Sequence, residues 1–176
     1  MRRDEVVITT MSVAAPWAKL SDGPLDFASV ESAMGHAADF GYGLAMAQPQ
    51  RRVIVLNGDG SMLMCLGTLV TIAQRPLENF TLVITENGTY EVTGNQPVPG
   101  AGIADYEAIA RGAGIERVCT IDNDHDFDEN LSSHFEAKGP LVFIWKIARA
   151  TEPVPRPALP IRTRARRLRQ ALAGND

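Results

Sequence analysis

The sequence has little cysteine, no long apolar run and no excess of positive charge. Its two cysteines, Cys65 and Cys119, form no CxxC pair, which fits small buried residues in a reducing compartment better than a disulfide framework. No stretch is long enough to span a bilayer, and the short apolar run after residues 1–5 argues against a signal peptide. The formal net charge of −4 gives no general attraction to nucleic acid or to an anionic membrane. We therefore expect a cytoplasmic protein that binds neither.

Short β-rich runs alternate along the chain with helical patterns. The 176 residues suffice for one domain with a sizeable core. Strands separated by helices imply right-handed crossovers and a largely parallel sheet, and continuous apolar runs imply that both faces of it are covered. The expected fold is therefore α/β: a doubly wound, mostly parallel six-strand sheet with helices on both faces. Strands are predicted at 5–9, 27–30, 52–56, 80–85, 117–121 and 141–147, and helices at 13–20, 34–47, 61–74, 106–112 and 127–138.

The composition changes after residue 150. Residues 1–150 are expected to form the domain, and residues 151–176 a proline-rich arm followed by a short basic helix. The favoured interpretation of that helix is a solvated tail or an arm that packs on another chain. A nucleic-acid role is disfavoured, because the helix lacks interleaved aromatic residues and the protein is acidic.

A lone carboxylate, Asp59, stands between Gly58 and Gly60 where a buried strand ends and a helix begins. Helix N-termini offer unpaired N–H groups that suit phosphate, glycines let the backbone turn and approach an anion, and Ser61 is placed to cap the helix and donate to phosphate. A carboxylate beside phosphate repels it unless a cation lies between them, which favours Mg²⁺. The alternative for Asp59 is a plain helix cap.

A second polar cluster, residues 86–90, follows the next strand. Asn87 lies 28 residues after Asp59, a spacing that places both at one edge of the sheet on successive strands. The Asn87 amide oxygen is a hard ligand, and a bend at Gly88 would present the Thr89 carbonyl. With two phosphate oxygens and one water, these groups complete the octahedral set that Mg²⁺ prefers.

This paired motif resembles the diphosphate-binding motif of thiamine diphosphate enzymes. The similar segments are SAMGHAADFGYGLAMA, VIVLNGDGSMLMCLGTLVTIA, FTLVITENGTYEVTGNQ, ADYEAIARGAG and KGPLVFIWKI with EPVPRP, within residues 4–160. Within the superfamily, the chain is most similar to the β subunit of sulfopyruvate decarboxylase and to the matching half of phosphonopyruvate decarboxylase.

The resemblance implies roles for individual residues. Asp59, Asn87 and the Thr89 carbonyl match the metal ligands. The cofactor-binding set comprises Ser32, Met34, Gly58, Asp59, Gly60, Ser61, Asn87, Thr89 and Tyr90. The Ser32 carbonyl would accept from the aminopyrimidine, and Met34 would hold the cofactor bent, although Met34 as plain core is an alternative. His36 is a candidate catalytic residue, with a structural histidine as the favoured alternative.

The resemblance also implies a function and a partner. The cofactors would be thiamine diphosphate and Mg²⁺, and the reaction decarboxylation of a small 2-oxo acid. The glutamate that activates the aminopyrimidine belongs to a different domain in this superfamily. We therefore expect a β subunit that is inactive without a pyrimidine-binding α subunit. The alternatives are a carboligase component of the acetolactate synthase type and a non-catalytic cofactor-binding partner. Glu91, near the expected substrate mouth, argues against an anionic sulfo- or phosphono-substrate.

Overall fold

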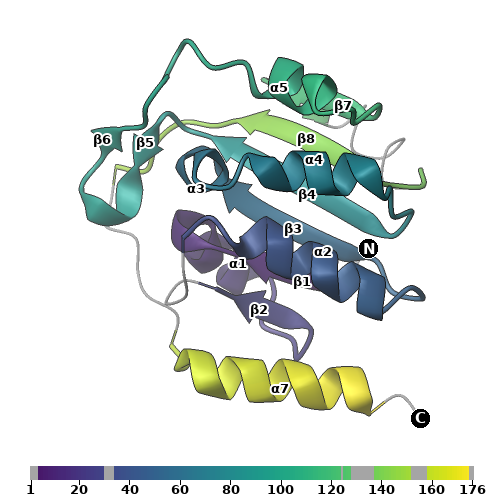
Figure 1. Cartoon of the computed structure of the whole chain (residues 1–176). Coiled ribbons are helices and arrows are strands. Elements are labelled where there is room, and N and C mark those ends of the chain that lie inside the picture. Colours follow the sequence, from purple (N-terminus) through teal and green to yellow (C-terminus); the bar gives the residue numbers. More distant parts are fainter. Residues whose placement is uncertain (1–3, 30–33, 124, 128–136, 152–157, 175–176) are drawn as a thin grey trace.

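A six-strand parallel sheet forms the centre of the molecule (Figure 1). The computed structural model describes residues 4–29, 34–123, 125–127, 137–151 and 158–174. The strand order is β2-β1-β3-β4-β8-β7, and every neighbouring pair is parallel. The strands are β1 (Val6–Thr9), β2 (Asp26–Ala28), β3 (Val53–Gly58), β4 (Phe80–Glu86), β7 (Val118–Ile121) and β8 (Leu141–Lys146). This confirms the predicted α/β sheet, in which all six strands are parallel.

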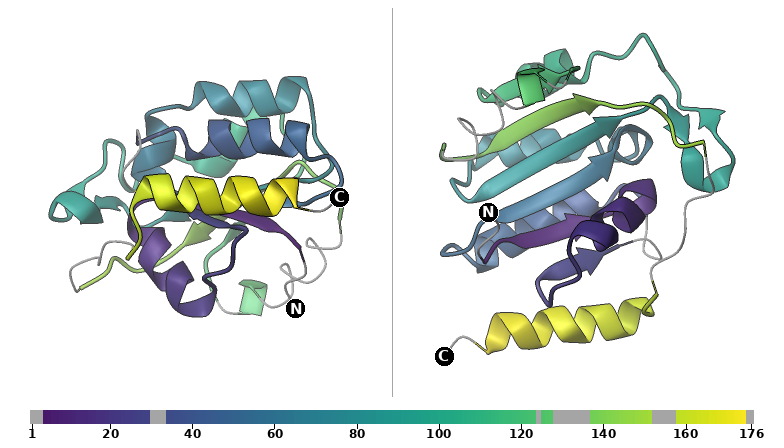
Figure 2. Two further views of the ribbon diagram at one scale, coloured as in Figure 1. Left: turned by 90° about the horizontal axis from the view of Figure 1, so that it is seen from below. Right: turned by 180° about the vertical axis from the view of Figure 1, so that it is seen from behind.

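Helices cover both faces of the sheet, as the sequence predicts. Figure 2 shows α2 and α4 on one face, α1 on the other, and α7 along the edge formed by β2. The helices are α1 (Ala14–Leu20), α2 (Ala37–Ala47), α3 (Asp59–Leu63), α4 (Gly67–Gln74), α5 (Tyr106–Gly112) and α7 (Ile161–Ala173), with single 3-10 turns η1 (Met11–Val13) and η2 (Glu91–Thr93).

The core divides according to the alternation of side chains along the strands. Val53 and Val55 of β3 and Leu82 of β4 belong to the larger cluster, which includes residues of α2, α4 and α5. Val83 and Phe143 point to the opposite face and belong to a smaller cluster. Buried side chains on both faces explain why these strands are continuous apolar runs rather than alternating ones.

Besides shifts of one or two residues at the ends of other elements, the structure differs from the predicted elements in three places. The helix predicted over 61–74 is two helices, α3 and α4, because the N–H groups of Met64, Cys65, Thr68 and Leu69 bond to the carbonyl three residues earlier, which tightens the chain where α3 ends and α4 begins. The helix predicted from residue 34 begins at Ala37. A small antiparallel pair, β5 (Thr89–Tyr90) and β6 (Gln96–Pro97), was not predicted; η2, Gly94 and Asn95 connect its strands, whereas Asn87-Gly88 lies before β5. Most of the helix predicted over 127–138 lies outside the described residues, as does most of the proline-rich arm.

Helix α7 packs on its own domain, contrary to the favoured interpretation of a solvated tail or an arm for another chain. Leu168 is buried in the larger core cluster. Arg164, also buried, donates from Nη1 to the Ala28 carbonyl of β2 at 2.5 Å. Arg167 pairs with Asp22 at 2.6 Å. These arginines therefore fasten the helix beside the edge strand, which covers an edge otherwise open to pairing.

No helix within the described part of the chain combines the length and the hydropathy needed to cross a membrane.

Two glycines in the middle of α2 provide a test of the packing. A Cβ added at Gly41 would lie 2.2 Å from Cγ2 of Val55, whereas one at Gly43 would meet nothing within 4 Å. Alanine in a helix interior is ordinarily favoured over glycine by about 1 kcal/mol. We expect Gly43→Ala to stabilise the protein by about that amount and Gly41→Ala to destabilise it by about 1–3 kcal/mol through overpacking. Urea unfolding measures both, and equal effects of the two substitutions would contradict the observed packing of α2 on β3.

Candidate functional site

A pocket of about 230 Å³ lies where the strand order reverses. The chain leaves β1 for β2 on one side and returns through α2 to β3 on the other, so the carboxyl ends of β1 and β3 diverge there. Ligands of doubly wound sheets bind at such switch points. The pocket is lined by Met11, Ser12, Met34, Gly58, Asp59, Gly60, Ser61, Asn87, Thr89, Tyr90, Glu91, Val92 and Thr93.

Asp59 connects two strand ends through its carboxylate. It is the first residue of α3, directly after β3, and its side chain is buried. Oδ1 accepts from the Gly60 N–H and Oδ2 from the Gly88 N–H, both at 2.7 Å. The register pairs Gly58 with Thr85, so β3 and β4 end at the same level. The two clusters predicted to share one edge of the sheet therefore meet through a direct hydrogen bond.

Asn87 begins the turn that follows β4. Its Oδ1 accepts from the Thr89 N–H at 2.9 Å, which orients the amide oxygen and leaves it a second lone pair. Gly88 has φ of 71°, the left-handed region that favours glycine, and this supplies the predicted bend. Asn87 and Thr89 both line the pocket beside Asp59. The three predicted metal ligands thus surround one cavity.

Ser61 and Met34 approach the pocket from different segments. The Ser61 hydroxyl oxygen accepts from the Gly35 N–H at 3.0 Å, which ties α3 to the turn that carries Met34. Ser61 lies inside α3, and Gly58 occupies the N-cap position, so the expected capping role of Ser61 is wrong. The hydroxyl hydrogen of Ser61 stays available as a donor. Ser32 lies outside the described residues.

The two glycines that flank Asp59, Gly58 and Gly60, differ in whether the structure requires a glycine. Gly58 has φ of −76°, which any residue adopts, and an added Cβ would meet nothing within 4 Å. The expected sharp turn is therefore not what requires a glycine at Gly58. An added Cβ at Gly60 would lie 2.4 Å from the Tyr90 ring and 2.8 Å from Val98. Gly60 thus allows the segment after β4 to pack against the first turn of α3.

The site concentrates negative charge without a neutralising cation among its lining residues. Burial raises the pKa of Asp59, and hydrogen bonds from backbone N–H groups, Gly88 first, counteract this. Burial also raises the pKa of Glu86; Lys146 opposes that shift, and Asp59 and Asp105 add to it. Within the described part of the chain, none of the pocket-lining residues is Lys, Arg or His. Such a cluster of carboxylates favours a bound cation.

Two buried polar groups near the site were not predicted as site residues. Asn57, fully buried in β3, has a side-chain oxygen with no hydrogen-bond partner among the described residues. The Tyr106 hydroxyl at the start of α5 is buried and unpartnered in the same part of the chain. Burial raises the pKa of Tyr106, and the Asp59 and Glu86 carboxylates add to the shift. For Asn57, the available signal was an asparagine at the end of an otherwise apolar strand. For Tyr106, nothing in the sequence pattern indicated a buried polar group.

His36 does not line the pocket, although it was a candidate catalytic residue. It occupies the N-cap position of α2 without making a side-chain cap, and its Nδ1 pairs with Asp39 at 2.8 Å. Its imidazole is exposed and hydrogen-bonded to Asp39, which agrees with the favoured alternative of a satisfied structural histidine.

The fold and the strand-end carboxylate together define the class of protein. Residues 8–144 match the family model described as "Thiamine pyrophosphate enzyme, C-terminal TPP binding domain". The chain therefore belongs to the thiamine diphosphate enzymes and contains their C-terminal cofactor-binding domain.

Individual members of the family are similar to this chain over most of its length. The chain is 38% identical over 130 residues to sulfopyruvate decarboxylase subunit beta of Methanothermobacter thermautotrophicus, which covers 73% of this chain and 68% of that protein. It is 33% identical to phosphonopyruvate decarboxylase of Streptomyces viridochromogenes, over 77% of this chain but 33% of that one. The thiamine diphosphate-dependent 4-hydroxybenzoylformate decarboxylase of Rhodococcus jostii RHA1 has the same fold, with a TM-score of 0.67 over 86% of this chain and 30% of that one at 21% identity.

The contrast between the two glycines gives a prediction about the unliganded protein. Gly60→Ala should force the Tyr90 ring and Val98 away from α3 and cost about 1–3 kcal/mol of stability, which lowers Tm by several degrees. Gly58→Ala should stay within about 0.5 kcal/mol of the parent, because its Cβ points into open space. Thermal unfolding followed by circular dichroism compares the two, and an undiminished Tm for Gly60→Ala would refute the packing of Tyr90 on α3.

Proposed function

We propose that this chain is the diphosphate-binding β subunit of a thiamine diphosphate- and Mg²⁺-dependent 2-oxo acid decarboxylase. The observation that carries the proposal is the Asp59 carboxylate, buried at a strand end and tied to the Asn87 turn through the Gly88 N–H. Membership of the thiamine diphosphate enzymes and similarity to two decarboxylases support it.

The residues present fit a metal–diphosphate group. Each Asp59 oxygen accepts one backbone hydrogen bond and keeps lone-pair capacity for a cation. Asp59, the Asn87 amide oxygen and the Thr89 carbonyl are hard oxygen donors, which Mg²⁺ prefers over nitrogen or sulfur. A divalent cation would also compensate the negative charge that the pocket lining leaves unneutralised. Asp59, Asn87 and Thr89 would hold the metal.

The same pocket would hold the rest of the cofactor. The space above Gly58 admits a diphosphate close to the backbone, and the Ser61 hydroxyl is placed as a donor to it. Met34 would supply the apolar support for the bent cofactor, Ser32 the carbonyl for its aminopyrimidine, and Tyr90 part of the wall. When bound, thiamine diphosphate supplies the nucleophilic carbon and the electron sink for decarboxylation. The protein's contribution is to bind, bend and shield it.

A partner subunit is part of the proposal. Several relatives, including one of 38% identity, are named as beta subunits of sulfopyruvate decarboxylase. The glutamate that activates the aminopyrimidine would come from the α subunit, which would also form the opposite wall of the pocket. Glu91 lines the pocket, and no basic side chain lies among its described lining residues. A sulfonate or phosphonate on the substrate would therefore have to be recognised by the partner.

Asp59→Asn tests the metal assignment. The amide keeps the shape of the side chain, removes the charge and replaces one of the two accepting oxygens by a donor, so Mg²⁺-dependent affinity for thiamine diphosphate in the assembled complex should fall at least tenfold, about 1.4 kcal/mol. Glu91→Gln is the matched control, because it removes a carboxylate from the same pocket without removing a proposed ligand. Its affinity should not fall. Calorimetry distinguishes the two, and equal losses in both variants would sink the assignment.

The partner requirement has its own test. The chain alone, saturated with Mg²⁺ and thiamine diphosphate, should release no CO₂ from a panel of small 2-oxo acids, because the activating glutamate is missing. Turnover should appear when the product of the neighbouring gene is added and vanish when the partner's glutamate is changed to glutamine. An aldehyde product supports a decarboxylase, whereas a ketol would identify a carboligase of the acetolactate synthase type. Robust turnover by the isolated chain would refute the half-site.

A further inference from the structure

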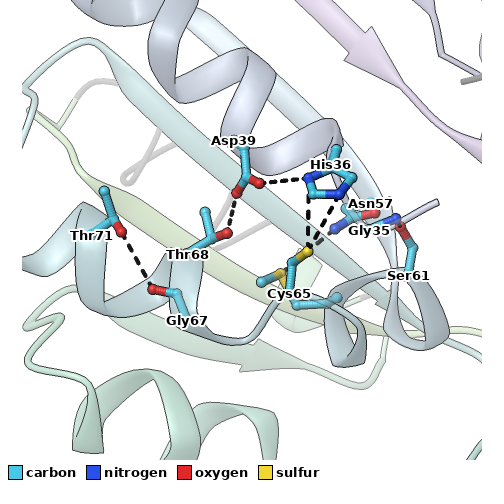
Figure 3. Close-up of polar contacts among 10 residues, drawn as sticks. Gly35, His36, Asp39, Asn57, Ser61, Cys65, Gly67, Thr68 and Thr71 are labelled. Carbon is cyan, nitrogen blue, oxygen red and sulfur yellow. Dashed lines mark hydrogen bonds and ion pairs between the residues drawn. The ribbon is translucent and has the colours of Figure 1, made fainter. Parts of the chain in front are cut away.

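Three metal-binding side chains converge outside the cofactor pocket (Figure 3). His36 and Asp39 come from the N-terminal end of α2, and Cys65 from the turn between α3 and α4. Their potential ligand atoms all lie within 4.8 Å of one another. Across the part of the chain that the structure describes, this is the one group of three or more His, Cys, Asp or Glu residues with that property.

The backbone at Gly35 makes this convergence possible. Gly35 has φ of 95°, and an added Cβ would lie 3.0 Å from Met64 Cβ and 3.2 Å from Cys65 Sγ. Only a residue without a side chain lets the turn before α2 come this close to the turn after α3. The approach brings the His36 ring to 3.8 Å and 4.0 Å from Cys65 Sγ, measured at Nδ1 and Nε2.

The geometry does not suit a cysteine nucleophile activated by histidine. Cys65 Sγ is almost equally far from both ring nitrogens, so it lies on the line of neither lone pair, and Nδ1 is already paired with Asp39. Burial and the neighbouring Asp39 carboxylate both raise the pKa of the Cys65 thiol, which disfavours the reactive thiolate.

The separations do suit a tetrahedral metal ion. Zinc bonds of roughly 2.0–2.3 Å to nitrogen, oxygen and sulfur place neighbouring ligands about 3.3–3.7 Å apart. The Sγ–Nδ1 distance of 3.8 Å is close to this, and the Nδ1–Oδ2 distance of 2.8 Å would open slightly. Both partners in that pair are partly exposed and can adjust. The Thr68 hydroxyl donates to the other Asp39 oxygen, as groups behind a metal-bound carboxylate commonly do.

We propose that His36, Asp39 and Cys65 form a binding site for a borderline-soft divalent cation of the Zn²⁺ class, with the fourth position open to solvent. Thiolate and imidazole select such ions against Mg²⁺, so this site and the Asp59 site would not share a metal. The ion would cross-link the turn that carries Met34 to the turn that follows Ser61. Its binding would therefore hold two walls of the pocket in their relative positions.

The test needs no cofactor, so its outcome is independent of the proposed function. The full chain, stripped with chelator and kept in excess Mg²⁺, is titrated with Co²⁺ and Zn²⁺. We expect one ion per chain and, with Co²⁺, the near-ultraviolet absorption of a thiolate–metal bond, displaced by Zn²⁺. Cys65→Ser should abolish that absorption and weaken Zn²⁺ binding at least tenfold by calorimetry. His36→Gln and Asp39→Asn should weaken Zn²⁺ binding at least tenfold with circular dichroism unchanged.

Two control variants separate this site from other metal binding. Cys119→Ser should retain the thiolate absorption, because Cys119 lies on β7 away from the cluster. Asp59→Asn should retain it as well, since Asp59 serves the other site. Absence of the absorption in the parent chain, its persistence in Cys65→Ser, or its loss in Asp59→Asn would overturn the proposal.

Discussion

The buried carboxylate of Asp59 is the interaction on which the site depends. It accepts N–H groups from Gly60, in its own helix, and from Gly88, in the turn after the neighbouring strand. It adds to the sheet bonds and to the hydrogen bond from the Thr85 hydroxyl to the Asn57 carbonyl, and it ties the turn at Gly88 to the start of α3. Burial disfavours the charged form of an isolated carboxylate, but it strengthens the attraction between a carboxylate and a cation beside it. Structure and proposed metal binding thus rest on one side chain.

The parallel sheet provides the geometry that this carboxylate uses. Because β1, β3 and β4 run in one direction, their carboxyl ends open at one edge, and the reversal of strand order beside β1 leaves room for a pocket there. Close packing of small residues supports the arrangement: Gly41 lets α2 contact β3, and Gly60 lets Tyr90 contact α3. The contact at Gly41 lies outside the pocket, whereas the contact of Tyr90 with Gly60 lies in its wall. Ser61, bonded to the Gly35 N–H, links the pocket to the His36, Asp39 and Cys65 cluster.

The negative charge of the pocket suggests different binding roles for this chain and its proposed partner. Among the described residues, the pocket lining contains Asp59 and Glu91 and no basic side chain, so it would suit a cation and the cofactor that the cation is proposed to hold. Recognition of an anionic substrate would fall to the other subunit. Arg164 and Arg167 of α7 do not supply that charge, because they bind β2 and the loop before it.

The sequence by itself determined the sheet, its direction and the pairing of Asp59 with the Asn87 turn. Apolar runs of strand length alternate with helices, and the spacing of 28 residues equals one crossover, so these features are encoded locally. Only the tertiary structure decided why Gly60 must be small, that Ser61 bonds to Gly35 rather than capping its helix, and that α7 covers β2. It alone brought Cys65 to His36 and buried the Asn57 oxygen and the Tyr106 hydroxyl beside the site, where neither has a hydrogen-bond partner among the described residues. These facts depend on contacts between segments distant along the chain, which no local pattern specifies.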